Sequence, residues 1–393
     1  MVFSVKTYNN INQIGLKELG NHFQIDGDLA KNPDAYIIRS QNLHDTVFPD
    51  NLKAIARAGA GTNNIPVDEA TEKGIVVFNT PGANANAVKE AVLASILLSA
   101  RDYIAANAWV NTLSGDDVPK QIEAGKKQFA GSEITGKTLG VIGLGAIGAR
   151  IANYAYRLGM KVYGYDPYVS IEAAWNISHH VKRVSDLKEI FENCDYITVH
   201  VPLTPDTTGT FNADAFNLMQ KGTTIINFAR AELVDNDALF DALETGVVKR
   251  YITDFGTEDL LNKPNVTVFP HVGGSTGEAE LNCAIMAGQT IRRFMETGEI
   301  VNSVNFPRVQ QALSAPYRIT LINKNVPNIV ARISTAVSDF NINIDNIINR
   351  SKGDYAYTLL DLDETDKEKI DELVAKFEAS DNIVRVRLIK GKK

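Results

Sequence analysis

Short apolar runs separated by turn residues are the dominant pattern in the first ninety positions. Residues 35–39 (AYIIR), 52–56 (LKAIA) and 74–79 (GIVVFN) have the length of strands, and glycine or proline follows each run closely. Helical patterns lie between them. Parallel strands covered on both faces have this appearance, so the segment predicts an α/β sheet. A longer helical pattern, rich in alanine and leucine, then runs from residue 86 to 107.

The same alternation of strands and helices restarts at Thr138 and predicts a second, doubly wound α/β domain. Seven strand candidates occur there: 138–142, 161–165, 180–184, 196–199, 224–227, 249–253 and 266–269. An alanine-rich helical pattern at 278–296 follows them and ends at Gly298. Its position indicates that the chain returns toward the first domain.

The last quarter of the chain predicts a linker followed by a small α+β unit. Residues 303–316 are polar, contain two prolines and show no clear period. Beyond them, 317–323, 355–362 and 383–389 alternate as strands do, whereas 329–340 and 366–380 have helical spacing. We therefore expect residues up to about 307 to hold the main activity on their own.

Composition excludes several classes of protein. A chain of 393 residues has room for two to three domains, and its net charge of −7 disfavours nucleic acid as a partner. Two cysteines cannot build a disulfide framework. The first residues lack the basic-then-apolar pattern of a signal peptide, and no apolar stretch is long enough to cross a membrane. We expect a cytoplasmic protein without a membrane partner.

A glycine-rich turn follows the strand candidate 138–142. Gly143, Gly145 and Gly148 occupy a G-x-G-x-x-G pattern that includes Ala146 and Ile147, and a helical pattern starts directly after it. Such a turn lets the backbone approach a pyrophosphate at a helix N-terminus. Asp166 stands at the end of the next strand, where a carboxylate binds a ribose hydroxyl and repels a 2′-phosphate. The pattern predicts an NAD site.

Three further strand candidates end in chemically active side chains. Arg230 follows the strand 224–227, the acidic segment 254–259 follows 249–253, and His271 follows 266–269. Ligands of open α/β sheets bind beyond these carboxyl ends. An arginine binds a carboxylate with two hydrogen bonds, and a histidine beside a carboxylate accepts a hydroxyl proton. This set suits oxidation of a 2-hydroxy acid.

Together these segments resemble the D-2-hydroxyacid dehydrogenase family over nearly the whole chain. GLGAIG, VHVPLTPDTTG (199–209), INFAR ending at residue 230 and PHVGGST around residue 271 follow one another in family order. The resemblance implies an NAD-binding Rossmann domain (96–279) inserted in a flavodoxin-like substrate domain (1–95 and 280–302). It implies that the cofactor also contacts Pro202, Thr207, Ala229, Asp254 and Gly273. RAGAGTNNI (57–65) and NTPGANANAVKE (79–90) resemble its substrate loops, which implies substrate contacts from Arg57, Gly59, Gly61 and Asn84.

The family's catalytic set is Arg, Glu and His, and this chain departs from its pattern at the acid. Arg230 and His271 match, although Ala231 stands where glycine is common. The family's glutamate usually precedes proline, whereas this sequence reads Thr257-Glu258-Asp259-Leu260. The residue type favours Glu258, because the family's acid is a glutamate. In many members the acid stands five positions after the residue that matches Asp254, and that count gives Asp259. Both stay candidates, with Glu258 preferred.

Residues 317–393 resemble an ACT domain, an amino-acid-sensing module. The resemblance implies effector contacts from Asn325 and Asn343. The usual Pro-Gly step reads Pro327-Asn328 here. Asparagine tolerates positive φ, but its side chain fills space beside the turn. Weak or absent inhibition by serine is therefore expected, and the alternative role of this domain is assembly.

The resemblance implies NAD-dependent oxidation of 3-phospho-D-glycerate to 3-phosphohydroxypyruvate, a step of serine biosynthesis, by a homodimer or homotetramer. A phosphorylated substrate needs cations in the first domain, for which Arg39, Arg57 and Lys89 are candidates. Two alternatives remain. One is a reductase of another 2-oxo acid such as hydroxypyruvate or 2-oxoglutarate, and the other is a non-catalytic NAD sensor that acts as a corepressor.

Overall fold

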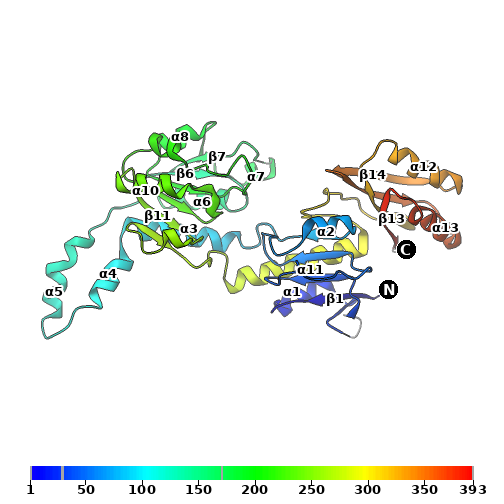
Figure 1. Cartoon of the computed structure of the whole chain (residues 1–393), viewed down its shortest axis with the longest axis horizontal. Coiled ribbons are helices and arrows are strands. Elements are labelled where there is room, and N and C mark those ends of the chain that lie inside the picture. Colours follow the sequence, from blue (N-terminus) through cyan, green and yellow to red (C-terminus); the bar gives the residue numbers. More distant parts are fainter. Residues whose placement is uncertain (1, 28–30, 170, 392–393) are drawn as a thin grey trace. The chain divides into compact units, whose positions relative to one another are not determined.

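The computed structural model describes residues 2–27, 31–169 and 171–391, which form two compact units (Figure 1). One unit contains residues 1–83 and 280–393, and the other contains residues 84–279. The second unit is therefore inserted in the chain of the first. The boundary predicted at residue 95 falls inside helix α3 (Ala85–Ala100), which belongs to the inserted unit.

The first unit is built on a parallel five-stranded sheet with the order β2-β1-β3-β4-β5. This is the flavodoxin-like strand order. Its strands are β1 (Phe3–Thr7), β2 (Phe23–Ile25), β3 (Ala35–Ile38), β4 (Ala54–Arg57) and β5 (Val76–Phe78). Its helices are α1 (Gln13–Leu16), the 3-10 turn Lys17–Leu19, α2 (Val67–Glu72) and most of α11 (Gly277–Thr297).

Helix α11 is tied to the first unit by a close crossing with α1. A Cβ added to Gly15 would lie 2.4 Å from the Cβ of Ala284, so only glycine allows this approach. The same face of α11 buries Ile291 and Phe294 in the core beside β1 and β5. The late helix thus completes the core that the first residues begin.

The inserted unit is a doubly wound domain with a parallel seven-stranded sheet. Its strand order is β12-β11-β10-β9-β6-β7-β8, which reverses direction between β6 and β9. All seven predicted strands form: β6 (Thr138–Ile142), β7 (Lys161–Tyr165), β8 (Lys182–Arg183), β9 (Tyr196–Val199), β10 (Thr223–Asn227), β11 (Val248–Thr253) and β12 (Val266–Val268). Its other elements are α3, α6 (Gly148–Arg157), α7 (Ile171–Trp175), α8 (Leu187–Asn193), α9 (Ala213–Leu218), α10 (Asn236–Glu244) and the 3-10 turns Ala231–Leu233 and Glu258–Leu260.

The helix predicted over 86–107 is broken in two. Helix α3 ends at Ala100, and α4 (Tyr103–Val110) begins after Asp102, whose carboxylate accepts the Ala105 amide and pairs with Arg250 at 2.6 Å. With α5 (Val118–Gly125) and the 3-10 turn Lys126–Phe129, α4 forms a hairpin that projects from the domain (Figure 1). No residue of α4 or α5 is buried.

The C-terminal part is an antiparallel four-stranded sheet with two helices. The sheet order is β14-β15-β13-β16, and α12 and α13 contribute to the hydrophobic core on one of its faces. The bounds are β13 (Tyr317–Lys324), α12 (Ile329–Asp339), β14 (Ile344–Lys352), β15 (Tyr355–Leu362), α13 (Lys367–Glu378) and β16 (Ile383–Lys390). Strand β14 was not predicted, because most of its side chains are half-buried or exposed and show no clean alternation.

The other face of this sheet packs on the flavodoxin-like part of the same unit. Ile322, Tyr357 and Leu359 belong to the core that contains Phe294 and Phe306. The Tyr357 hydroxyl donates to the Gly298 carbonyl at 2.6 Å.

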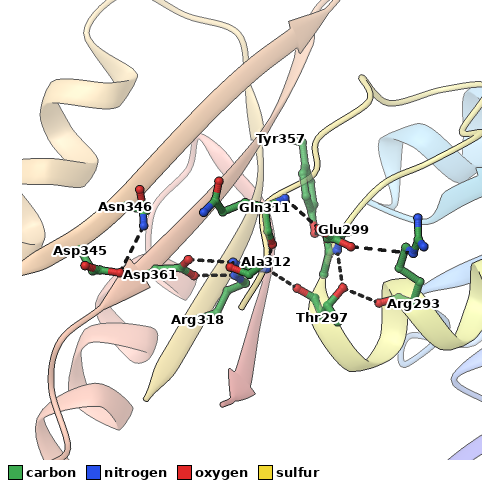
Figure 2. Close-up of polar contacts among 11 residues, drawn as sticks. Arg293, Thr297, Glu299, Gln311, Ala312, Arg318, Asp345, Asn346, Tyr357 and Asp361 are labelled. Carbon is green, nitrogen blue, oxygen red and sulfur yellow. Dashed lines mark hydrogen bonds and ion pairs between the residues drawn. The ribbon is translucent and has the colours of Figure 1, made fainter. Parts of the chain in front are cut away.

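A buried ion pair reinforces this contact. Arg318 pairs with Asp361 and also donates to the Thr297 and Gln311 carbonyls at 2.8 and 2.9 Å (Figure 2). The side chains of both ion-pair partners are almost fully buried. The segment 303–316 takes part in the core as well, since Phe306 and Val309 are buried.

Candidate active site

The glycine-rich turn lies at the reversal point of the seven-stranded sheet, between β6 and α6. Gly143 has a φ of +88°, and a Cβ there would lie 2.7 Å from the His200 carbonyl. A Cβ on Gly148 would overlap the Gly143 carbonyl at 1.8 Å. A Cβ on Gly145, by contrast, would meet nothing within 4 Å. The first and third glycines are thus required by packing, and the second faces open space, as close approach of a pyrophosphate to the backbone requires.

Asp166 lies against this turn. Its carboxylate accepts the Leu144 amide and the Tyr168 amide, both at 2.8 Å, and its side chain is half-buried. No ion pair to a lysine or arginine is formed by Asp166 in the described ranges. An unpaired carboxylate at this place suits a ribose diol and disfavours a 2′-phosphate.

The loop after β9 closes on itself beside the turn. The Thr207 hydroxyl donates to the Pro202 carbonyl at 2.7 Å and accepts the Thr204 amide at 2.8 Å. His200 bonds to the Thr198 hydroxyl at 2.8 Å, and burial lowers the pKa of its imidazole to about 3. His200 is therefore neutral at physiological pH.

Arg230 is held by a buried asparagine at the end of β10. Asn227 accepts the amides of Ala229 and Arg230 at 3.0 and 3.3 Å and donates to the Arg230 carbonyl at 2.7 Å. This fixes the backbone of the turn, while the Arg230 side chain is exposed and lies 5.9 Å from the centre of the Phe255 ring.

Asp254 holds the turn that carries His271. Its carboxylate is buried and accepts the Val272 amide at 2.9 Å and the Gly273 amide at 2.7 Å. His271 itself has a φ of +55°, a left-handed conformation that is rare outside glycine. Its ring centre lies 4.7 Å from that of Phe255, so one aromatic ring contacts both Arg230 and His271.

The two candidate acids differ in their hydrogen bonding. Asp259 accepts from the Thr257 hydroxyl through one oxygen and from the Asn236 amide at 2.9 Å through the other. These two bonds hold the pKa of Asp259 below its usual range, and the bond from Thr257 has the larger effect. Glu258 is exposed, and none of the hydrogen bonds or ion pairs of the described residues involves its side chain.

The predicted substrate residues are divided between the two units. Arg57, Gly59 and Gly61 lie in the first unit, in and after the end of β4, where the Arg57 guanidinium donates to the carbonyls of Arg39 and Gly61. Arg39 also pairs with Glu280 at 2.7 Å.

Asn84 belongs to the inserted unit and lies directly before α3. A Cβ on Gly274 would meet its amide at 2.6 Å, which places Asn84 beside the His271 turn. Lys89 is buried, donates to Asn86 at 2.8 Å and lies over the Tyr154 ring.

The proposed effector residues lie near two ends of the C-terminal strands. Asn325 follows β13 and donates from its side chain to the Gly353 carbonyl at 3.2 Å. Asn343 precedes β14, is exposed, and accepts the Asp363 amide through its carbonyl. Asn328 has a φ of +65° and stands directly before α12, so the turn of the family pattern forms here without its glycine.

Sequence reasoning missed Phe255, Asn227 and Asn236. Two signals were available: Asn227 is the last residue of a buried strand, and Phe255 directly follows the buried Asp254, the first residue after β11. Among the described residues no helix is long and apolar enough to span a membrane, and no three His, Cys, Asp or Glu side chains gather as metal ligands.

Comparisons with known proteins identify the family of this chain. Residues 93–273 match the family described as D-isomer specific 2-hydroxyacid dehydrogenase, NAD binding domain. The chain is 36% identical over 313 residues to D-3-phosphoglycerate dehydrogenase of Methanocaldococcus jannaschii, covering 77% of this chain and 58% of that protein. It is 30% identical over 363 residues to D-3-phosphoglycerate dehydrogenase 1 of Saccharomyces cerevisiae, covering 86% and 74%.

A solved structure of NAD⁺-bound 3-phosphoglycerate dehydrogenase from Entamoeba histolytica matches with a TM-score of 0.60 at 26% identity, covering 78% of this chain and 99% of that one. The chain therefore belongs to the D-isomer specific 2-hydroxyacid dehydrogenase family, and its inserted unit contains the family's NAD-binding domain. It spans little more than half the length of several relatives, 58% for the Methanocaldococcus protein and 55% for one from Synechocystis.

Proposed function

We propose that this chain catalyses NAD-dependent oxidation of 3-phospho-D-glycerate to 3-phosphohydroxypyruvate. The observation that carries the proposal is the placement of Arg230 and His271 against one ring, Phe255, at the carboxyl ends of β10 to β12. The glycine-rich turn that fits a dinucleotide lies at the same edge of the same sheet. The names of the relatives supply the substrate.

The chemistry follows from the side chains. Arg230 holds the C1 carboxylate of the substrate through its guanidinium. The His271 imidazole accepts the proton of the C2 hydroxyl while the C2 hydride leaves, and the C2–O bond becomes a carbonyl. NAD⁺ bound at the glycine-rich turn would supply the acceptor for this hydride. A carboxylate from the turn after β11 stabilises the imidazolium that forms.

We assign the binding of NAD to the glycine-rich turn (143–148), to Asp166 and to the loops that follow β9 to β12. Asp166 favours NAD over NADP because it lies beside the turn without a cation. Of the other cofactor contacts predicted, Thr207 and Asp254 both bond within their own loops. They shape the site and offer only their remaining lone pairs to a ligand.

Recognition of the phosphate falls to Arg39 and Arg57. Both lie at carboxyl ends of parallel strands in the first unit, where ligands of such sheets bind. Lys89 is a poorer candidate, since its ammonium is buried against Asn86 and Tyr154.

Assembly into a homodimer or homotetramer is supported by the α4–α5 hairpin. Tyr103, Ile104 and Val110 expose 56%, 51% and 39% of their surface on a helix without buried residues, which is costly for a monomer. The C-terminal β-α-β-β-α-β order supports an ACT-like domain. Two buried, unpaired cysteines suit a reducing compartment such as the cytoplasm.

A substrate panel tests the proposal. Initial rates with NAD⁺ are measured for 3-phospho-D-glycerate, D-glycerate, D-lactate and D-2-hydroxyglutarate, and with NADH for hydroxypyruvate and 2-oxoglutarate. The highest kcat/KM is expected for 3-phospho-D-glycerate. Preference for another acid would keep the mechanism and change the substrate. NAD binding without turnover of any acid would favour the sensor.

A further inference from the structure

A cluster of three polar residues holds the turn after β11, and we call it the Asp259 lock. It consists of Asn236 in the first turn of α10 and of Thr257 and Asp259 in the turn itself. The Asn236 amide donates to one Asp259 oxygen at 2.9 Å, and the Thr257 hydroxyl donates to the other. Asn236 also lies 3.4 Å from the Thr257 hydroxyl. The lock thus joins the turn to a helix of the core.

The turn has few other restraints. It is a 3-10 helix of three residues, and Leu260 is its buried member. Asn262 and Asn265 farther along the loop have positive φ. Without the lock, a turn of this kind samples many backbone conformations, and ordering it costs conformational entropy. A reacting group mounted on such a turn needs an external restraint to be in place when chemistry occurs.

The lock also separates the roles of the two acids. Asp259 has a hydrogen-bond donor to each oxygen, so only its remaining lone pairs are available to another group. Glu258, in the same three-residue helix, has no such bond. The loop is tied to the His271 turn at its other end, where Asp254 accepts the Val272 and Gly273 amides. Glu258 lies four residues beyond that attachment.

We infer that Asn236 and Asp259 are positioning residues that present the Glu258 carboxylate to His271. The family's usual acid is followed by proline, whose ring restricts the backbone. This chain has Asp259 at that place, and its two hydrogen bonds supply the restraint instead. The inference rests on the proposed function for the reaction, whereas the tautomer of His271 can be measured in the free protein without turnover.

A double-mutant cycle in kcat tests the inference. Glu258→Gln is expected to lower kcat about 10²-fold or more and to shift the acidic limb of the kcat/KM profile. Asn236→Ala and Asp259→Ala are each expected to lower kcat by roughly 10- to 100-fold while KM for NAD stays unchanged. Asp259→Asn, which keeps one acceptor and lets the Asn236 amide rotate to match, is expected to recover much of the loss. When Asn236→Ala or Asp259→Ala is combined with Glu258→Gln, the double variant should have the same kcat as Glu258→Gln alone.

Two exposed residues provide matched controls for these variants. Asn217→Ala in α9 and Asp241→Ala in α10 remove the same side-chain types from exposed positions. Neither side chain forms a hydrogen bond among the described residues, so both variants should leave kcat unchanged.

A second readout does not need turnover. In protein labelled with ¹⁵N-histidine, the ring shifts of His271 report its tautomer, and His271→Asn assigns the signals. One tautomer is expected to dominate in the wild type, and a mixture in Glu258→Gln, Asn236→Ala and Asp259→Ala. If 3-phospho-D-glycerate is not oxidised but these tautomer changes occur, the proposed function fails and the lock stands.

Two results would overturn the inference. Wild-type turnover in Glu258→Gln with a large loss in Asp259→Asn would make Asp259 the acid that serves His271. Equal losses from Asp259→Ala in the wild-type and Glu258→Gln backgrounds, with an unchanged His271 tautomer, would make the lock a purely structural feature.

Discussion

Short polar side chains at the ends of buried strands set the backbone of the candidate site. Asn227 and Asp254 are each buried, and each bonds the amides of the residues that follow a strand. Their partners include Arg230 and the neighbours of His271, the two residues to which we assign chemistry. A left-handed His271 is costly in isolation, and two charge-assisted hydrogen bonds to the next amides offset that cost.

Changing Asp254 to asparagine tests this restraint. The backbone amide of either Val272 or Gly273 would then face a side-chain NH2 group instead of a carboxylate oxygen. The loss of such a buried, charge-assisted hydrogen bond costs about 1–3 kcal/mol. We expect the free energy of unfolding, measured with urea, to fall by this amount and kcat to fall with it. An unchanged kcat beside a reduced stability would show that the His271 turn does not depend on Asp254.

His200, whose ring nitrogen Nδ1 is buried, makes stability depend on pH. Burial lowers the pKa of its imidazole from 6.5 to about 3, so between these values the unfolded chain binds a proton that the folded chain excludes. Stability from this group is therefore full above pH 6.5 and is lost as the pH falls toward 3, by at most about 1.4 kcal/mol per pH unit.

The test compares urea unfolding of the wild type and His200→Asn at about pH 7.5 and pH 5.5. The wild type should lose about 1 kcal/mol more than the variant on going to the lower pH. Equal losses of stability in the wild type and in His200→Asn would mean that a group other than His200 takes up the proton.

At the scale of elements, apolar runs in the sequence predicted strands correctly where most side chains of the strand are buried. All seven strands of the inserted unit were predicted, and β6, β9 and β10 consist largely of buried residues, whereas β8 (Lys182–Arg183) is exposed. The break between α3 and α4 was not, because the Asp102 side chain is fixed there by Arg250, 148 residues away. The roles of Glu258 and Asp259 stayed open for the same reason, since the donor from Asn236 lies in a different element.

The projecting hairpin yields a prediction about assembly. Replacing Tyr103, Ile104 and Val110 by serine removes the exposed apolar surface of α4 without touching a buried residue. We expect sedimentation velocity to show a smaller species with an unchanged circular dichroism spectrum. Lys120→Ala, on exposed α5, serves as the control and should leave the size unchanged. An unaltered species in the triple variant would exclude α4 as the contact.

At the scale of the molecule, the C-terminal sheet is part of the first unit's core. The polar composition of 303–316 predicted a tether, but apolar side chains before, within and after it are buried together, Phe294, Phe306 and Leu359 among them. Sequence patterns report which residues are buried and not what covers them, so this shared core was not predictable. These contacts argue against the predicted independence of the first 307 residues.

Truncation after Pro307 tests the shared core. It would uncover Phe294 and Phe306 and leave the Gly298 and Thr297 carbonyls without their donors Tyr357 and Arg318. We expect the shortened chain to aggregate in size-exclusion chromatography or to melt well below the full chain. A monodisperse, equally stable product would mean that the two parts fold separately.

The transfer of hydrogen from C2 of the substrate to the nicotinamide tests the central claim most directly. With 3-phospho-D-glycerate deuterated at C2, NAD⁺ and the full chain, the account predicts that the NADH formed carries one deuterium by mass spectrometry. His271→Asn should slow its formation by about 10²–10⁴-fold and leave NAD affinity unchanged. No deuterated NADH from the wild type, or wild-type turnover in the histidine variant, would contradict the account.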